Sequence, residues 1–264
     1  MAIKIGLIGY GNMAQAIASG MIFSGNYDPN QIMVTDLFKR ADIGGMRWGR
    51  HNIEVAEFSD VLVLAVKPGQ YKEVIDEIKG HLKADVIIIS IAAGLKIATL
   101  ESYFDGSVKL MRTMPNTPAQ LNLGMTALMP NEKMSHSDIK IAQAMFDAVG
   151  KTEIVSEDLI EAVIVTSGSS PAYIYMMIEA MIKGGMNEGM SREMATTFVT
   201  QAMIGATAMV METGIAPTDL RDAVCSPGGT TIEAVKYLQN HDFEALVMEA
   251  MKACAARSRK MAEK

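Results

Sequence analysis

Two glycines and an alanine near the start of the chain have the spacing of a phosphate-binding turn. Gly9, Gly11 and Ala14 read G-x-G-x-x-A directly after an apolar run at 3–8, and the apolar spacing then becomes helical. Strand, glycine turn and helix in this order are the context that a dinucleotide fingerprint requires. Gly9 would permit the tight turn, Gly11 would let the backbone approach a pyrophosphate, and Ala14 would let the helix pack closely. The first helical amides would then face the phosphates.

A second stretch with possible chemistry is 225–233, which reads CSPGGTTIE. Thr230 and Glu233 have the spacing of a capping box, in which each side chain would bond the backbone amide of the other residue. One interpretation is therefore a well-capped helix. The other is an anion site, because the Pro-Gly-Gly before the helix leaves its first amides open to a substrate carboxylate. Thr231 would then lie at the first helical position with a free hydroxyl.

The composition argues against several classes of function. The chain has 264 residues, a net charge of −6 and no visible basic stripe, so a nucleic-acid partner is not expected. Its two cysteines, Cys225 and Cys254, have no C-x-x-C spacing, and no signal-peptide pattern precedes the first strand. Both observations favour a reducing, cytoplasmic location. The four histidines are scattered without a metal-binding spacing, so no metal site is expected.

An uncharged stretch at 194–211 reaches the minimum length of a membrane span. It contains four threonines, a glutamine and a glycine, and it lacks a leucine-rich core. A helix that is apolar on most faces can also be buried inside a protein. We therefore expect a core helix and no membrane partner.

Apolar runs predict the strands of one sheet, at 3–8, 31–35, 61–66, 86–91 and 108–112. These runs are continuously apolar, as in parallel strands that are covered on both faces. Helical patterns separate them, which indicates a doubly wound parallel sheet of the Rossmann type with right-handed crossovers. A further strand at 122–129 is expected at the edge of the sheet. Ligands bind at the carboxyl ends of such strands, where this chain reads GYGNM, AVKPGQ, SIAAG and RTMPNTP.

The residue after the second strand bears on the choice of cofactor. Asp36 lies 22 positions beyond Ala14, close to the spacing of a carboxylate that binds the adenosine ribose. Lys39 and Arg40 follow closely and would instead suit a 2′-phosphate. The choice between NAD and NADP stays open at this point.

The second part of the chain reads as helical. A helix from 157 is expected to be interrupted at 167–171, where a serine cap and Pro171 would begin the next helix at 172–183. Ser191 would begin the long uncharged helix and Gly214 would end it. Two helices that are apolar nearly all round exceed the interior of so small a domain, so we expect mutual burial between two subunits.

At this level of detail the chain is similar to pyrroline-5-carboxylate reductases over essentially its full length. The motifs that carry the resemblance stand in the family's order: IGYGNMAQAI at 8–17, AVKP at 65–68, SIAAG at 90–94, RTMPNTP at 112–118, SGSSPAY at 167–173 and SPGGTT at 226–231. The resemblance implies a Rossmann domain at 1–160 and an all-helical dimerisation domain at 161–264. It also implies a homodimer, often assembled into larger rings, and a small-molecule substrate. The implied reaction is the reduction of the ring C=N of pyrroline-5-carboxylate to proline by NADP(H) or NAD(H).

The same resemblance implies the site residues. Those expected to line the cofactor are Gly9, Tyr10, Gly11, Asn12, Met13, Asp36, Asn52, Ala65, Val66, Lys67, Pro68, Ala92, Ala93 and Gly94. Those expected to bind the substrate are Ser226, Gly229, Thr230 and Thr231. An imine accepts hydride well only when its nitrogen is protonated or hydrogen-bonded, and no histidine stands in any motif. A hydroxyl or water must therefore be the donor, and we expect Thr231 to be the catalytic residue.

The resemblance has departures, and other functions remain open. Ser170 replaces the usual second glycine of SGSGPAY, and Gly69 separates AVKP from its glutamine. A β-hydroxyacid dehydrogenase would need a catalytic lysine on a helix of the second domain, and Lys183 beside Gly-Gly suits a helix end better. A dinucleotide-sensing protein without activity would have no need of SPGGTT.

Overall fold

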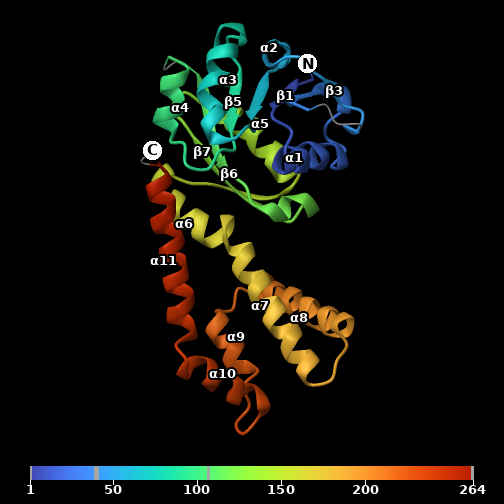
Figure 1. Cartoon of the computed structure of the whole chain (residues 1–264), viewed down its shortest axis with the longest axis vertical. Coiled ribbons are helices and arrows are strands. Elements are labelled where there is room, and N and C mark those ends of the chain that lie inside the picture. Colours follow the sequence, from blue (N-terminus) through green and yellow to red (C-terminus); the bar gives the residue numbers. More distant parts are fainter. Residues whose placement is uncertain (1, 39–41, 106–107, 263–264) are drawn as a thin grey trace. The chain divides into compact units, whose positions relative to one another are not determined.

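The computed structural model describes residues 2–38, 42–105 and 108–262. The chain divides into two compact units, Met1–Ser169 with Ala255–Lys264 and Ser170–Cys254 (Figure 1). This division falls nine residues after the predicted domain boundary at 160/161, and the last ten residues group with the first unit. The functional boundary at 160/161 stays a prediction.

The first unit is built on one eight-stranded sheet in the order β3-β2-β1-β4-β5-β6-β7-β8. Its strands are β1 (Ile5–Ile8), β2 (Ile32–Thr35), β3 (Arg47–Trp48), β4 (Val61–Leu64), β5 (Ile87–Ser90), β6 (Lys109–Met114), β7 (Gly124–Pro130) and β8 (Gly150–Ile154). All neighbouring strands are parallel except β6 and β7, which are antiparallel. The doubly wound sheet is thus confirmed.

Two strands were not expected from the sequence. β8 pairs in parallel with β7, so β7 is not the edge strand that 122–129 was predicted to be. β8 reads GKTEI and is largely exposed, and β3 is only two residues long. Neither has the apolar run by which the other strands were recognised.

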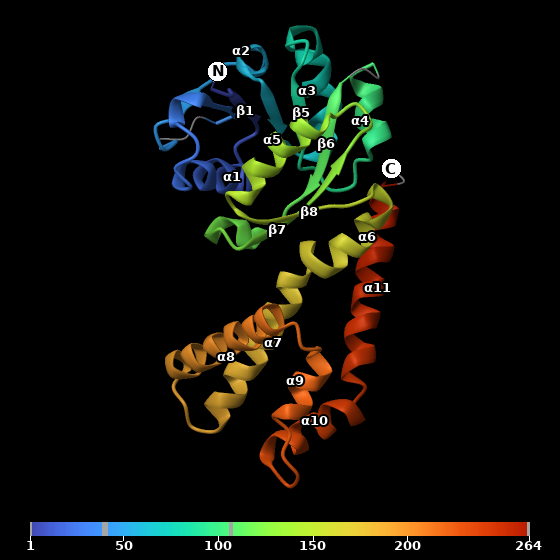
Figure 2. The ribbon, with the colours of Figure 1, turned by 180° about the vertical axis from the view of Figure 1, so that it is seen from behind.

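Both faces of the sheet are covered by helices (Figures 1 and 2). One face packs against α1 (Asn12–Phe23) and α5 (His136–Asp147), and the other packs against α2 (Asn52–Phe58), α3 (Tyr71–Ile78) and α4 (Ile97–Tyr103). Within β4, Val61 and Val63 join the first cluster, whereas Leu62 and Leu64 join the second. Because successive side chains of a strand point to opposite faces, a strand buried on both faces must be continuously apolar.

Short helical turns connect these elements. They are η1 (Pro29–Gln31), η2 (Pro68–Gln70), η3 (Lys79–His81), η4 (Thr117–Leu121) and η5 (Glu157–Leu159).

The helical path after η5 differs from the prediction at Ser167–Pro171. It runs through α6 (Ile160–Val163), a π-helical segment (Ile164–Gly168) and α7 (Ser170–Asn187). The predicted interruption is confirmed, but its form differs: the amide of Ser169 donates to the carbonyl of Ile164 at 2.7 Å in a widened turn, and the next helix begins at Ser170, not at 172. Such widening is one way for a helix to accept Pro171, which has no amide hydrogen and would crowd the carbonyl four residues earlier.

The second unit contains helices only. They are α7 (Ser170–Asn187), α8 (Arg192–Thr213), α9 (Pro217–Ala223), α10 (Thr230–Asn240) and the first part of α11 (Phe243–Ala262). α7 continues through Gly184 and Gly185, so Lys183 does not lie at a helix end; it pairs with Glu179 on the surface. The predicted ends of α8 are confirmed, because Ser191 caps the amide of Met194 and Gly214 adopts a left-handed φ of +66°.

Helix α8 is not buried within one chain. Only Ala195 and Val199 are buried, whereas Phe198 is 62% exposed and Ile204 is 63% exposed. Among the described residues, α8 is also the one helix long and apolar enough to cross a membrane by length and composition. The sequence predicted that α8 is a core helix, and a single chain does not bury it. A further molecule must cover α8 if that prediction is to hold.

Candidate functional site

The glycine turn between β1 and α1 lies at the carboxyl end of the sheet. Gly9 has a φ of +90°, and a Cβ there would lie 2.7 Å from the backbone of Ala65, so only glycine fits. Gly11 precedes α1 as its N-cap, and nothing lies within 4 Å of a Cβ built on it. Since no described side chain caps α1, its first amides stay open to an anion.

A hollow of about 570 Å³ opens beside this turn. Of the predicted cofactor residues, those that line it are Gly9, Gly11, Asp36, Asn52, Ala65, Val66 and Lys67. The remaining lining residues were not predicted: Ile8, Thr35, Leu37, Arg50, His51, Gln70, Val74 and Glu77. The predicted residues that do not line it are Tyr10, Asn12, Met13, Pro68, Ala92, Ala93 and Gly94.

Asp36 is held in place by backbone donors. Its Oδ2 accepts from the amide of Tyr10 and its Oδ1 accepts from that of Leu37, both at 2.7 Å. Lys39 and Arg40, the predicted alternatives for a 2′-phosphate, lie outside the described residues. Arg50 lines the same hollow, just before α2. Arg50 was not predicted, because it does not belong to the charged residues that directly follow β2.

A buried hydrogen-bond network supports the next loop along the rim. The hydroxyl of Tyr71 donates to the carbonyl of Leu64, and the hydroxyl of Ser90 donates to Tyr71 at 3.1 Å. Ser90 Oγ also accepts from the amide of Ala92 at 3.3 Å. Burial raises the pKa of Tyr71 well above its ordinary value, so its hydroxyl stays protonated and can donate. The network thereby fixes the first residue of the Ala92–Gly94 loop.

The loop after β6 is fixed by Asn116. Its Oδ1 accepts from the amide of Met125 at 2.8 Å, and its Nδ2 donates to the carbonyl of Ser167 at 3.1 Å. In a regular helix that carbonyl would accept from the amide four residues on, which is Pro171 and has no hydrogen. Asn116 therefore supplies the donor that the proline lacks, and two of the sequence motifs meet here.

The SPGGTT stretch lies in the second unit and does not form the predicted capping box. Gly229 is the N-cap of α10, so Thr230 is the first helical residue and Thr231 the second. Glu233 pairs with Lys236 at 2.9 Å instead of reaching back. No described side chain caps α10, so its first amides are more open than the sequence predicted.

Close packing explains the glycines of this stretch. Gly228 has a φ of +72°, and a Cβ on Gly229 would lie 2.5 Å from the hydroxyl of Ser226. The amide of Gly229 donates to the carbonyl of Ser226 at 3.0 Å, which closes the turn. Within the described part of the chain, no group of three histidine, cysteine, aspartate or glutamate side chains could hold a metal ion.

The glycine turn, the hollow at the strand ends and the helical second unit together define an oxidoreductase that binds a nicotinamide dinucleotide. Comparison with known families agrees: residues 4–94 match the family of coenzyme F420-dependent NADP oxidoreductases, and residues 157–261 match the pyrroline-5-carboxylate reductase dimerisation family.

Known relatives match over the full length. The pyrroline-5-carboxylate reductase of Escherichia coli is 42% identical over 98% of both chains, and that of Arabidopsis thaliana is 38% identical over 98% of this chain and 96% of its own. The crystal structure of the Plasmodium falciparum enzyme with NADP bound has a TM-score of 0.92, at 30% identity and 98% coverage of both chains. A reductase structure from Coxiella burnetii has a TM-score of 0.91, at 34% identity and full coverage of both chains. The chain belongs to the pyrroline-5-carboxylate reductase family.

Proposed function

We propose that this protein reduces 1-pyrroline-5-carboxylate to L-proline with NAD(P)H, the final step of proline biosynthesis. The observation that carries the proposal is the pairing of two open helix N-termini in one chain. α1 follows a glycine turn suited to a pyrophosphate, and α10 follows a glycine loop beside the hydroxyls of Thr230 and Thr231. The full-length relatives that are named for this reaction also support the proposal.

The residues of the first hollow fit a dinucleotide. Gly11 leaves room for a close approach, the open amides of α1 suit a pyrophosphate, and Asp36 suits ribose hydroxyls. When bound, the reduced nicotinamide supplies the hydride. The protein's part is to bind and orient the two reactants.

The start of α10 fits the substrate carboxylate. Amides at a helix N-terminus favour an anion through their free N–H groups and the helix dipole. The substrate carries its carboxylate on the carbon next to the ring nitrogen. A carboxylate held at Gly229 and Thr230 therefore brings that nitrogen close to the hydroxyl of Thr231. A hydrogen bond from Thr231 strengthens as the nitrogen gains basicity, so it favours the transition state.

We further infer that the protein is a cytoplasmic homodimer that associates through the second unit. The match to a dimerisation family and the exposed apolar side chains of α8 support the homodimer. A second apolar surface lies at a hollow of about 970 Å³ between α9, α10 and the start of α11, where Val235, Leu238 and Met248 are among the lining residues. Burial of both surfaces against a second copy of the chain would explain why α8 is apolar nearly all round.

The decisive experiment is a spectrophotometric assay of nicotinamide oxidation. We expect NADH or NADPH to be oxidised in the presence of pyrroline-5-carboxylate, with proline formed in equal amount by amino-acid analysis. β-Hydroxy acids with the oxidised cofactor should give no reaction. Oxidation of β-hydroxy acids without turnover of pyrroline-5-carboxylate would favour the dehydrogenase alternative. Binding of the cofactor without either reaction would favour a sensing protein.

A further inference from the structure

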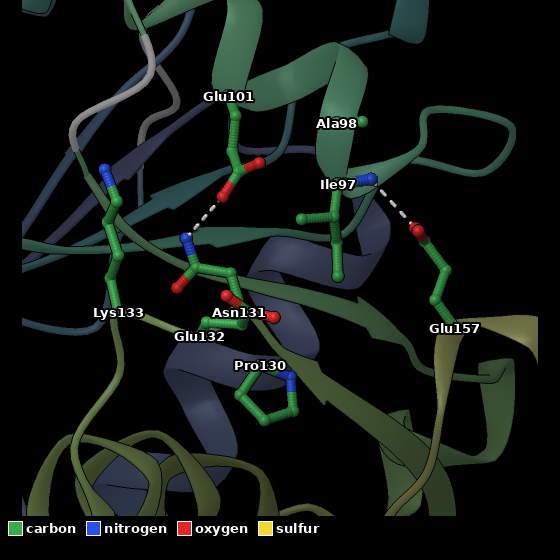
Figure 3. A pocket seen from close by; sticks show the side chains of 8 residues that line it. All are labelled: Ile97, Ala98, Glu101, Pro130, Asn131, Glu132, Lys133 and Glu157. Atoms are coloured by element: carbon green, nitrogen blue, oxygen red, sulfur yellow. Dashed lines mark hydrogen bonds between the residues drawn. The ribbon is translucent and has the colours of Figure 1, made fainter.

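One carboxylate outside every sequence motif joins a helix and a strand of the first unit. Glu157 begins η5, and its Oε1 accepts from the amide of Ile97 at 2.8 Å and from Nη1 of Arg112 at 2.7 Å. Figure 3 shows Glu157 reaching across to the start of α4, with the hydrogen bond to Ile97 drawn. A single oxygen thus connects η5, α4 and β6.

The partner of Glu157 in the sheet is a buried cation. The side chain of Arg112 is 4% exposed, and its Nε has no hydrogen-bond partner among the described residues. Glu157 is the one carboxylate that pairs with this guanidinium in the described structure. A buried charge that loses its only counter-charge is strongly unfavourable, so Arg112 holds Glu157 at this position.

β5, whose chain leads on into α4, and β6, which carries Arg112, are neighbours in the sheet. Ser90 of β5 is in register with Arg112 of β6, and both strands are parallel. The loop from Ile91 to Lys96 is held at its beginning by the bond from Ala92 to Ser90 Oγ, and at its end by the bond from Ile97 to Glu157. Glu157 is the side chain that bonds the first amide of α4, which is also held by the buried Leu100.

We propose that Glu157 is a positioning residue for hydride transfer, which fixes the loop at 91–96 against the end of β6. The proposal rests on the proposed function, because in an open parallel sheet the cofactor lies along the carboxyl ends of the strands, where the loop at 91–96 begins. Glu157 acts through Ile97 and Arg112, so its loss would misplace the loop and leave the adenosine end of the cofactor site at Asp36 unchanged. Small misplacements of a reacting group lower the rate strongly.

The test compares Glu157→Ala with a control, Glu132→Gln. Glu132 is exposed and lines, together with Glu157, the pocket drawn in Figure 3. For Glu157→Ala we expect kcat to fall about 10-fold, with little change in the KM for NADPH. Amide hydrogen exchange in 91–98 should become faster. The control should match the wild type in both measurements. The proposal would be overturned if Glu157→Ala folds and has the same kcat and the same amide exchange in 91–98 as the wild type.

A second variant separates misplacement of the loop from a general loss of stability. Arg112→Met/Glu157→Ala removes the stranded charge as well, so its melting temperature should exceed that of Glu157→Ala, while kcat stays low because Ile97 still lacks its acceptor. Recovery of kcat together with the melting temperature would overturn the positioning role, and this variant also decides the matter if Glu157→Ala does not fold. A wild-type protein without reductase activity would contradict the proposed function, and the exchange measurement would still decide whether Glu157 holds the loop.

Discussion

Thr231 is the residue on which the proposed chemistry depends most. Thr231→Val keeps the shape of the side chain and removes its hydroxyl donor. If Thr231 hydrogen-bonds the substrate nitrogen, kcat should fall about 10²-fold, while the Kd for NADPH stays nearly unchanged. Steady-state kinetics and fluorescence titration would measure the two effects. Near-normal kcat would make water the proton source.

Thr230→Val is a separate test, of how the helix begins. The sequence predicted that Thr230 caps the helix, and loss of such a cap would lower stability. The structure places the N-cap at Gly229, with no side-chain cap among the described residues. We now expect Thr230→Val to change the free energy of unfolding by less than about 0.5 kcal/mol.

Asp36 and Arg50 should act on cofactor choice in opposite directions. Both line the hollow beside the glycine turn, and a carboxylate there repels a 2′-phosphate whereas a guanidinium attracts it. Asp36→Ser should raise the ratio of kcat/KM for NADPH to that for NADH, and Arg50→Gln should lower it. Initial rates with both cofactors test this. An unchanged or reversed ratio for Asp36→Ser would mean that the basic residues dominate.

Among the elements, α5 begins with a complete capping box. Ser135 and Asp138 bond each other's amides in a capping box, and Lys109 lies 3.1 Å from Asp138. Burial by itself would raise the pKa of Asp138, but the hydrogen bonds from Ser135 and the charge of Lys109 outweigh it and hold the pKa below its ordinary value of 3.8. The ionised carboxylate therefore stabilises the folded state above that value, and its contribution is lost as the pH falls through the lowered pKa.

Asp138→Asn should lower the free energy of unfolding by about 1 kcal/mol at neutral pH. The difference from the wild type should shrink as the pH falls below 3.8, because the wild-type carboxylate then becomes protonated. Urea unfolding at several pH values and one protein concentration would measure this. Asp85→Asn is the control, since Asp85 also lies near Lys109 but is 94% exposed. A difference that does not depend on pH would contradict the role of the charge.

On the scale of the whole molecule, folding of the second unit should depend on dimerisation. Phe198 is 62% exposed on α8 in a single chain. We expect light scattering at micromolar concentration, without detergent, to find no folded monomer. Phe198→Glu should leave aggregated or unfolded protein, whereas Phe198→Leu should still dimerise. A stable and active monomer would refute this prediction.

Features that depend on local pattern could be predicted from the residue types alone. The continuously apolar strands, the turn at Gly9 and Gly11, and the ends of α8 at Ser191 and Gly214 were predicted correctly. Each follows from residue types within a few positions, such as the positive φ that glycine permits. The six motifs in family order likewise indicated the family.

Tertiary structure decided the features that join distant parts of the chain. β8 is polar and exposed, and it becomes a strand only because β7 offers it a partner. At the π-helical segment, the carbonyl of Ser167 accepts from Asn116, which lies 51 residues earlier in the chain. Glu157 reaches Arg112 across 45 residues. Local periodicity carries no information about such contacts, because their free energy arises only after the sheet has brought the partners together.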